Sequence, residues 1–406
     1  MIDIYTDLIR RPLYLKKIEP YIGTHLIKVL TGQRRAGKSY ILKDIANYIK
    51  ELKPNARCIY LSTETGDGRT IKTSDELYNY VHSHLMDTAD NFVFIDEIQE
   101  IESFESAVKS LFAENCCDLY CTGSNAHLLS GELSTFLAGR CIQIQIHPLS
   151  YREFLQFYIM ENSVQTCLLY LERGGLPFLH SLPPEQSFAL EYLRNVSESI
   201  LFRDVIAREK IRNTSFLRNL VAYLADNSGN LFSANNISKC LKNQRITMNV
   251  QTIITYLQAL KNSFIISSVS RKDIQGMKIF EIGEKFYFED IGLRNCNAKN
   301  SYFDDSAKIL ENAVYNFLTQ QNFTVYVGQM GVKEIDFIAE KGQSKIYVQV
   351  SLSIADKITF DREIGNLMNI PDNFPKYIVT LDPLIRTPLP SGIICMHAKD
   401  FFMTEW

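Results

Sequence analysis

Short apolar runs alternate with amphipathic segments between residues 26 and 148. The runs have the length of buried strands, and they cover residues 26–31, 58–62, 92–95, 119–122 and 142–146. Segments of helix length lie between them, for example residues 39–52, where apolar residues recur every three or four positions. This alternation predicts a parallel β-sheet with helices on both faces.

The pattern changes after the fifth run. A helical stretch comes next, interrupted by the pairs Gly174-Gly175 and Pro183-Pro184. Three helix patterns and two strand-like runs follow, in the order of a winged helix-turn-helix. The final part begins with a helix pattern. Strand-like runs follow it, then a second helix pattern, and then further strand-like runs. We therefore expect an α/β chain with a core domain at residues 1–150, a helical lid or extension at 151–210, a winged helix at 211–300 and a further α/β domain at 301–406.

A glycine-rich loop follows the first strand-like run. Residues 32–39, GQRRAGKS, fit the pattern G-x-x-x-x-G-K-[ST], in which the glycines let backbone N–H groups turn toward phosphate oxygens. The helix that begins near Lys38 adds the positive end of its dipole. We expect Lys38 to reach the β- and γ-phosphates of ATP and the Ser39 hydroxyl to ligate Mg²⁺. The predicted nucleotide-binding residues are Gly32, Gln33, Arg34, Arg35, Ala36, Gly37, Lys38, Ser39 and Tyr40.

Two carboxylates follow the third run. Asp96 and Glu97 come directly after the apolar residues 92–95, at a strand end where open α/β sheets bind ligands. Asp96 is predicted to hold Mg²⁺, directly or through its waters. Glu97 is predicted to orient and polarise the attacking water. The core is thus expected to be a P-loop domain that binds ATP with Mg²⁺ and hydrolyses it.

Two weaker signals concern catalysis. If the strand at 119–122 lies between the strands that precede Gly32 and Asp96, then Ser124 or Asn125 would reach the γ-phosphate and its water; otherwise these residues form a simple turn. Arg140 precedes the fifth run and is a candidate arginine finger, acting within the chain or from a neighbouring subunit of a homo-oligomer. A solvated or salt-bridged arginine is an equal alternative.

Composition limits the class of protein and the cellular compartment that we expect. The chain is 46% hydrophobic and 22% charged, as globular proteins are, and no apolar run of about 18 residues could cross a membrane. Its start lacks the apolar segment of a signal peptide, and its nine cysteines form no C-x-x-C pair, which favours a reducing cytoplasm. Cys116, Cys117 and Cys121 are expected to be small buried side chains rather than metal ligands.

Residues 201–300 are locally basic. They contain 15 Lys and Arg against 8 Asp and Glu, although the whole chain has a formal net charge of −3. Such a block is typical of a face that meets DNA phosphates or of a solvated surface, and winged helices also serve as protein-binding linkers. The helix at 249–262 would be the recognition helix. The cations near it are Lys239, Lys242, Arg245, Lys261, Arg271, Lys272 and Lys278.

These motifs, in this order, resemble a large bacterial and archaeal family of AAA-type P-loop ATPases with a C-terminal restriction-endonuclease-like domain of uncharacterised function. The matching segments besides the loop are FVFIDEIQ at 92–99, CTGSN at 121–125, LAGR at 137–140, PLSYREF at 148–154, GGLP at 174–177 and EIDFIAE at 334–340. The resemblance implies ATP binding and hydrolysis, a cytoplasmic location, a winged-helix linker and a nuclease-like fold, but it implies no pathway.

The nuclease-like part departs from a functional site. A restriction-type core places acids on its first helix and on successive strands to hold Mg²⁺, and a lysine helps to activate water. Here Glu311 and Asp336 match, but the last motif has Gln349 in place of a carboxylate and Ser351 in place of lysine. Lys345 could substitute only by reaching the site from elsewhere. We therefore expect a degenerate domain that does not cut nucleic acid.

The leading hypothesis is a cytoplasmic ATP-driven switch that couples nucleotide state to a winged helix, an inactive nuclease-like module and a protein partner that the sequence does not identify. The alternative is a DNA-binding regulatory or defence protein with negligible ATP turnover. A third hypothesis, an active ATP-dependent nuclease, is disfavoured by Gln349 and Ser351.

Overall fold

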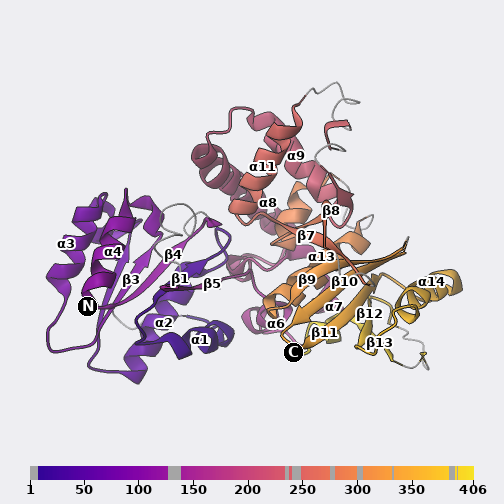
Figure 1. The fold of residues 1–406 in the computed structure, drawn as a ribbon, viewed down its shortest axis with the longest axis horizontal. Helices are drawn as coiled ribbons and strands as arrows, with labels where there is room; N and C mark the ends of the chain where they lie inside the picture. Colours follow the sequence, from indigo (N-terminus) through magenta and orange to yellow (C-terminus); the bar gives the residue numbers. More distant parts are fainter. Residues whose placement is uncertain are drawn as a thin grey trace. The chain divides into compact units, whose positions relative to one another are not determined.

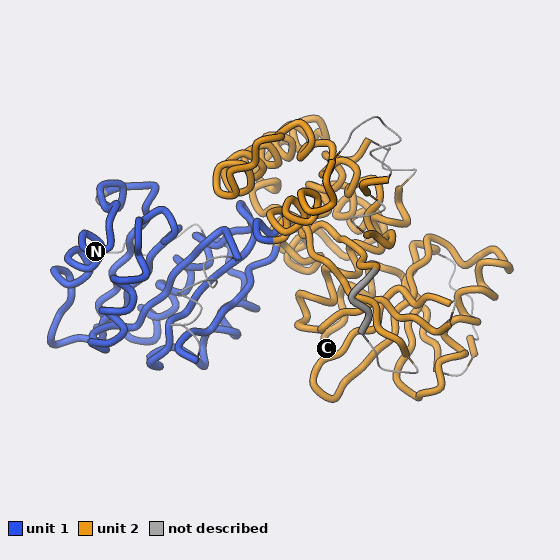
Figure 2. The backbone as a smooth tube through the Cα atoms, turned by 45° about the horizontal axis from the view of Figure 1, so that its top comes forward, with its two compact units in different colours: residues 1–147, 262–264 blue, residues 148–261, 265–406 orange. Residues whose placement is uncertain are grey.

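The computed structural model divides the chain into two compact units (Figure 2). The first contains residues 1–147 with 262–264, and the second contains residues 148–261 with 265–406. The residues that the structure describes are 8–126, 139–233, 237–239, 248–274, 279–299, 305–331, 333–383, 389–390 and 392–406. In these ranges no helix combines the length and the apolar character needed to cross a membrane.

The first unit is an α/β fold around a parallel sheet, drawn in indigo to magenta in Figure 1. Its described strands lie in the order β2-β3-β4-β1-β5. The elements are α1 (Pro12–Ile18), η1 (Glu19–Tyr21), β1 (Ile27–Thr31), α2 (Lys38–Leu52), β2 (Arg57–Ser62), η2 (Gly66–Thr70), α3 (Ser74–His84), β3 (Asn91–Asp96), η3 (Ile98–Glu100), α4 (Phe104–Glu114), β4 (Asp118–Gly123) and β5 (Cys141–Gln145).

Both faces of this sheet are buried. On β3, Phe92 and Phe94 belong to the core that contains α1 and α2, whereas Val93 and Ile95 belong to the core that contains α3 and α4. Successive side chains of a strand point to opposite faces, so a strand covered on both sides needs an unbroken apolar run. The expected α/β fold with a parallel sheet is confirmed for this unit.

The second unit contains helices followed by a mixed sheet, coloured magenta to yellow in Figure 1. The described strands lie in the order β13-β12-β11-β10-β9-β7-β8-β6. The elements are α6 (Tyr151–Tyr158), α7 (Val164–Arg173), η5 (Pro177–Ser181), α8 (Gln186–Ile200), the π-helix η6 (Leu201–Ala207), α9 (Thr214–Asp226), β6 (Leu231–Phe232), α11 (Val250–Asn262), β7 (Ile266–Asp273), β8 (Ile279–Phe288), α12 (Ile291–Asn297), α13 (Ser306–Gln320), β9 (Thr324–Met330), β10 (Lys333–Lys341), β11 (Ser344–Ser351), α14 (Lys357–Met368), β12 (Lys376–Thr380), β13 (Ile393–His397) and α15 (Ala398–Phe401).

The sheet of the second unit continues across residue 300, where a domain boundary was expected. Strand β7 pairs with β8 in an antiparallel hairpin, and Arg271–Asp273 of the same strand pair in parallel with Val327–Gln329 of β9. The hairpin and the C-terminal strands therefore belong to one sheet.

Candidate functional site

The loop between β1 and α2 requires glycine at two positions. Gly32 has a φ of 144°, and a Cβ atom on it would lie 2.2 Å from the carbonyl oxygen of Ile146. Gly37 has a φ of 99° at the N-cap of α2. The first N–H groups of a helix have no partner within the helix and form the positive end of its dipole. The loop therefore has a conformation and a polarity suited to phosphate.

Lys38 lies over this loop and is buried. Its Nζ donates hydrogen bonds of 3.1 Å to the carbonyl oxygens of Gly32 and Gln33. The same nitrogen lies 3.8 Å from Oε1 of Glu97. The folded chain thus places the lysine of the loop beside the carboxylate that is predicted to orient water.

Asp96 ends β3 next to the Ser39 hydroxyl. Ser39 Oγ donates to Asp96 Oδ1 at 3.0 Å, and Thr122 Oγ1 donates to the same oxygen at 2.6 Å. The Tyr60 hydroxyl donates to Oδ2 at 3.4 Å. Burial raises the pKa of Asp96 above its ordinary value, although the hydrogen bonds from Thr122 and Ser39 oppose the shift. A buried carboxylate beside a hydroxyl is an oxygen donor set that fits Mg²⁺.

Glu97 follows in a left-handed backbone conformation with a φ of 53°. Its N–H donates to Thr122 Oγ1 at 2.8 Å, so one hydroxyl contacts both acidic residues. Its side chain is 13% exposed and accepts a hydrogen bond from the amide of Gln99. Strained backbone of this kind clusters at functional sites.

Ser124 or Asn125 is predicted to reach the γ-phosphate if the strand before them lies between the strands that precede Gly32 and Asp96. Strand β4 lies between β3 and β1, and its register pairs Gly123 with Thr31, the residue before the loop. Both side chains are buried at the same edge of the sheet as Asp96. Their action on a γ-phosphate stays a prediction.

Arg140 lies at the end of the sheet where the parallel strands begin, opposite the end that carries Asp96. Its carbonyl oxygen accepts the N–H of Ile27 at 2.9 Å, and the register pairs Cys141 with Ile27 and Gln145 with Thr31. Arg140 is therefore beside the start of β1, whereas the loop follows its end, and five residues of strand span roughly 16 Å. This register argues against an arginine finger within the chain. A role at a neighbouring subunit stays a prediction.

The remaining predicted nucleotide-binding residues differ in exposure. Gln33 and Ala36 are buried, Arg34 is partly exposed and Arg35 is exposed. Tyr40 is 65% exposed on the first turn of α2. Their contacts with a nucleotide also stay predictions.

Sequence reasoning missed three side chains near the loop. Arg11 is buried and donates to the carbonyl oxygens of Ala36 at 3.1 Å and His147 at 3.0 Å, which ties the loop to the segment after β5. No motif marks Arg11. Thr122 and Gln99 lie inside matched segments, but only the fold shows that they contact Asp96 and Glu97.

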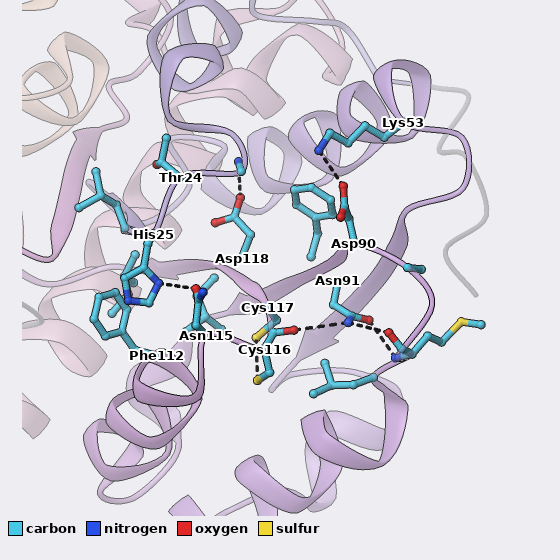
Figure 3. Close-up of a pocket in the computed structure, with 18 of the residues that line it drawn as sticks. Thr24, His25, Lys53, Asp90, Asn91, Phe112, Asn115, Cys116, Cys117 and Asp118 are labelled. Carbon is cyan, nitrogen blue, oxygen red and sulfur yellow. Dashed lines mark hydrogen bonds and ion pairs between the residues drawn. The ribbon is translucent and has the colours of Figure 1, made fainter.

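A separate cavity of about 560 Å³ lies where β1, β3 and β4 begin (Figure 3). Lys53 and Asp90 form an ion pair of 2.8 Å at its wall, and the sulfur atoms of Cys116 and Cys117 lie 3.9 Å apart. None of the predicted nucleotide-binding residues lines it. In the chain as folded, no group of three or more His, Cys, Asp or Glu among the described residues is arranged to hold a metal ion.

The second unit brings Glu311 and Asp336 together around a lysine that sequence reasoning missed. Nζ of Lys285 on β8 lies 2.9 Å from Glu311 Oε1 on α13. It lies 2.8 Å from Glu334 Oε1 and 3.9 Å from Asp336 Oδ1, both on β10. Lys285 precedes the expected nuclease-like segment, so no pattern in that segment points to it.

The other residues of the degenerate motif contribute little charge here. Gln349 Oε1 accepts the N–H of Asp336 at 3.4 Å, and Ser351 Oγ donates to the carbonyl oxygen of Ser353 at 2.9 Å. Lys345 pairs instead with Asp372 at 3.2 Å. The ammonium group beside Asp336 therefore comes from the preceding hairpin.

Many cations of the basic block are paired with carboxylates. The pairs are Lys272–Glu340, Lys285–Glu311, Arg294–Asp305, Arg218–Glu198 and Arg208–Asp204. The exposed residues of α11 are uncharged, namely Gln251, Ile254, Thr255 and Gln258. Lys242, Arg245 and Lys278 lie outside the described residues. The excess charge counted in the sequence is thus partly neutralised in the fold.

Residues 24–155 match a family model described as an AAA domain, and residues 165–303 match a domain of unknown function. An uncharacterized protein of Haemophilus influenzae is 32% identical over 402 residues, which are 98% of this chain and 99% of that protein. An uncharacterized protein of Methanocaldococcus jannaschii is 29% identical over 365 residues, which are 86% of this chain and 79% of that protein. The Aeropyrum pernix Orc1 protein in complex with DNA is 11% identical, with 72% of this chain and 93% of that chain covered and a TM-score of 0.35. At that score the likeness carries no argument.

Proposed function

This chain belongs to the same family as the Haemophilus influenzae protein and contains an AAA domain, and we propose that it binds ATP with Mg²⁺ and hydrolyses it. The observation that carries the proposal is the meeting of Lys38 and Ser39 with Asp96 and Glu97. These four residues come from two sequence segments. Lys38 Nζ lies 3.8 Å from Glu97 Oε1, and Ser39 Oγ lies 3.0 Å from Asp96 Oδ1.

Each side chain has a defined part in this proposal. Ser39 and Asp96 would hold Mg²⁺, which neutralises charge on the phosphate oxygens when bound. Lys38 would exchange its contacts with two loop carbonyls for phosphate oxygens. Glu97 would accept a hydrogen bond and then a proton from the attacking water, and Gln99 orients its carboxylate.

We further propose that the second unit contains a winged helix and a nuclease-like part without cleavage activity. Helices α9 and α11 followed by the β7–β8 hairpin support the first assignment. Glu311 on a helix and Asp336 on a strand of the same sheet support the second, and Gln349 and Ser351 speak against catalysis. The whole would act as a cytoplasmic switch for a protein partner.

Turnover of saturating ATP by the full chain, measured with and without duplex DNA, tests this function. The proposal expects turnover that Lys38→Ala and Glu97→Gln abolish. ATP binding without turnover would favour the alternative of a DNA-binding regulatory or defence protein. That alternative gains no support from the uncharged exposed face of α11. The partner can be sought by capture from cytosol with ATP held unhydrolysed.

A further inference from the structure

Lys285 is a buried lysine that faces carboxylates from two other elements. Its side chain is 4% exposed, and its Nζ lies within 2.9 Å of one oxygen each of Glu311 and Glu334. Asp336 Oδ1 is 3.9 Å away. Strands β8 and β10 are not neighbours in the sheet. These ion pairs therefore connect segments that are not hydrogen-bonded to each other as adjacent strands.

Two of the three carboxylates are held in place by further contacts. Glu311 Oε1 accepts a hydrogen bond from the Tyr287 hydroxyl at 2.6 Å, and Asp336 Oδ2 accepts one from the N–H of Val350 at 2.8 Å. Gly229 lies against Glu311, because a Cβ atom on this glycine would be 3.0 Å from Oε1 and 3.1 Å from Oε2. A larger residue at this position would push the carboxylate away from Lys285.

The charges of the cluster favour a resident cation. Burial raises the pKa of Asp336 to about 8, and the charge of Glu311 adds to the shift. Desolvation lowers the pKa of Lys285, but the charges of Glu311, Asp336 and Glu334 together raise it above its ordinary value. The lysine therefore stays charged at neutral pH.

We propose that Lys285 is a built-in cation that occupies the position of a divalent metal ion among Glu311, Glu334 and Asp336. Carboxylate oxygens bind Mg²⁺ at about 2.0–2.1 Å and Ca²⁺ at about 2.3–2.6 Å. An ammonium group at 2.8–2.9 Å from two of these carboxylates uses the same oxygens and nearly the same space. A divalent ion would have to displace it.

This inference has two consequences for the second unit. The lysine keeps the cluster free of metal, so the nuclease-like part lacks the metal-bound water that cleavage needs, whatever stands at Gln349. The ion pairs of Lys285 also link the β7–β8 hairpin to α13 and β10. The inference extends the proposed lack of cleavage, but it rests on the ion pairs and not on ATP hydrolysis or DNA binding.

Lys285→Met tests the proposal, because it removes the charge and keeps most of the side-chain volume. We expect the full-length variant to bind Mn²⁺ roughly a hundredfold more tightly than the parent or better, since the ion no longer has to displace a unit positive charge from the same carboxylates. Calorimetric titration without nucleotide measures the affinity. Thermal melting should show that Mn²⁺ raises the Tm of the variant and not that of the parent. Adding Asp336→Asn should abolish the gain.

Lys272→Met is the matched control. Lys272 lies on the same hairpin and pairs with Glu340 at 2.7 Å, but it faces no second carboxylate at ion-pair distance in the described residues. This variant should gain no Mn²⁺ affinity, and it keeps the same ATP site as a common background. If Lys285→Met does not fold without metal, Lys285→Met with Glu334→Gln restores the charge balance, retains Glu311 and Asp336, and carries the same expectation.

Three results would overturn the proposal. One is tight Mn²⁺ binding by the parent that Asp336→Asn removes. Another is the absence of any gain in both folded variants of Lys285. The third is an equal gain in Lys272→Met. Because the readout is metal binding without nucleotide or DNA, these results leave the proposed ATPase function unaffected.

Discussion

Glu97→Gln should leave ATP binding intact and nearly stop hydrolysis. The glutamine keeps the size of the side chain and removes the negative charge 3.8 Å from Lys38 Nζ. The contact with Thr122 runs through the backbone N–H of residue 97, so it survives the substitution. The change is therefore confined to the group that would accept the proton of the attacking water.

The sizes of the effects on hydrolysis and on ATP binding can be worked out in turn. A general base contributes about 10²–10⁴-fold to rate, which corresponds to about 3–5 kcal/mol at the barrier. The attraction between Lys38 and Glu97 lies between about 1 kcal/mol in water and about 4 kcal/mol at an effective dielectric constant of 20. Lys38 must give up part of this attraction to contact phosphate. ATP should thus bind the variant as tightly as the parent, or up to roughly tenfold more tightly.

Two measurements separate binding from chemistry. Equilibrium titration with a fluorescent ATP analogue gives the Kd, and release of inorganic phosphate under single-turnover conditions gives the rate of hydrolysis. Glu100→Gln is the matched control, because Glu100 is an exposed glutamate in η3, the short helix that follows Glu97, and should tolerate the change. Hydrolysis at the parental rate by Glu97→Gln would refute the assignment of Glu97 as the base.

Three further outcomes are expected. Lys38→Ala should weaken binding of the fluorescent ATP analogue at least about tenfold while Lys43→Ala on the same helix does not, because the backbone of the loop cannot replace an ammonium group at the phosphates; equal affinities would contradict the site. The folded-state pKa of Asp336, about 8, exceeds its ordinary value of 3.8, so the free energy of unfolding should fall as pH rises between these values, by at most about 1.4 kcal/mol per pH unit. Urea melts at pH 5–8 should show that the free energy of unfolding depends less steeply on pH in Asp336→Asn, in which Glu311 and Glu363 still face the site. An unchanged slope would exclude the carboxyl group of Asp336 as the source of this pH dependence. Plasmid and single-stranded DNA should stay intact with Mg²⁺ or Mn²⁺, with or without ATP, and nicking that Asp336→Ala abolishes would restore the nuclease hypothesis.

The strands and the edge of the first sheet could be predicted because local patterns determine them. A parallel strand buried on both faces needs a run such as residues 92–95, and such runs are visible in the sequence. Asp96 and Ser39 were expected to meet because both follow the carboxyl ends of strands. Arg140 shows the limit of that argument, since it precedes a strand and so lies at the other edge.

Contacts between distant segments could not be predicted. Lys285 is 26 residues from Glu311, on a different element, and nothing in its local sequence distinguishes it from a solvated lysine of a hairpin. Thr122 lies in a recognised motif, yet its contacts with Asp96 and Glu97 depend on β4 lying between β3 and β1. The same is true of the pairing between β7 and β9, which joins segments of different expected domains.

That pairing changes what a nucleotide-driven switch could move. The hairpin and the C-terminal strands share one sheet, and Lys285 and Arg294 each pair with an acid beyond residue 300. Separating them would break backbone hydrogen bonds between β7 and β9. It would also leave buried charges without partners, at a cost of about 3–5 kcal/mol for each broken pair. The parts that we propose to be a winged helix and a nuclease-like fold should therefore respond to ATP as one body. ATP should not change their arrangement relative to each other.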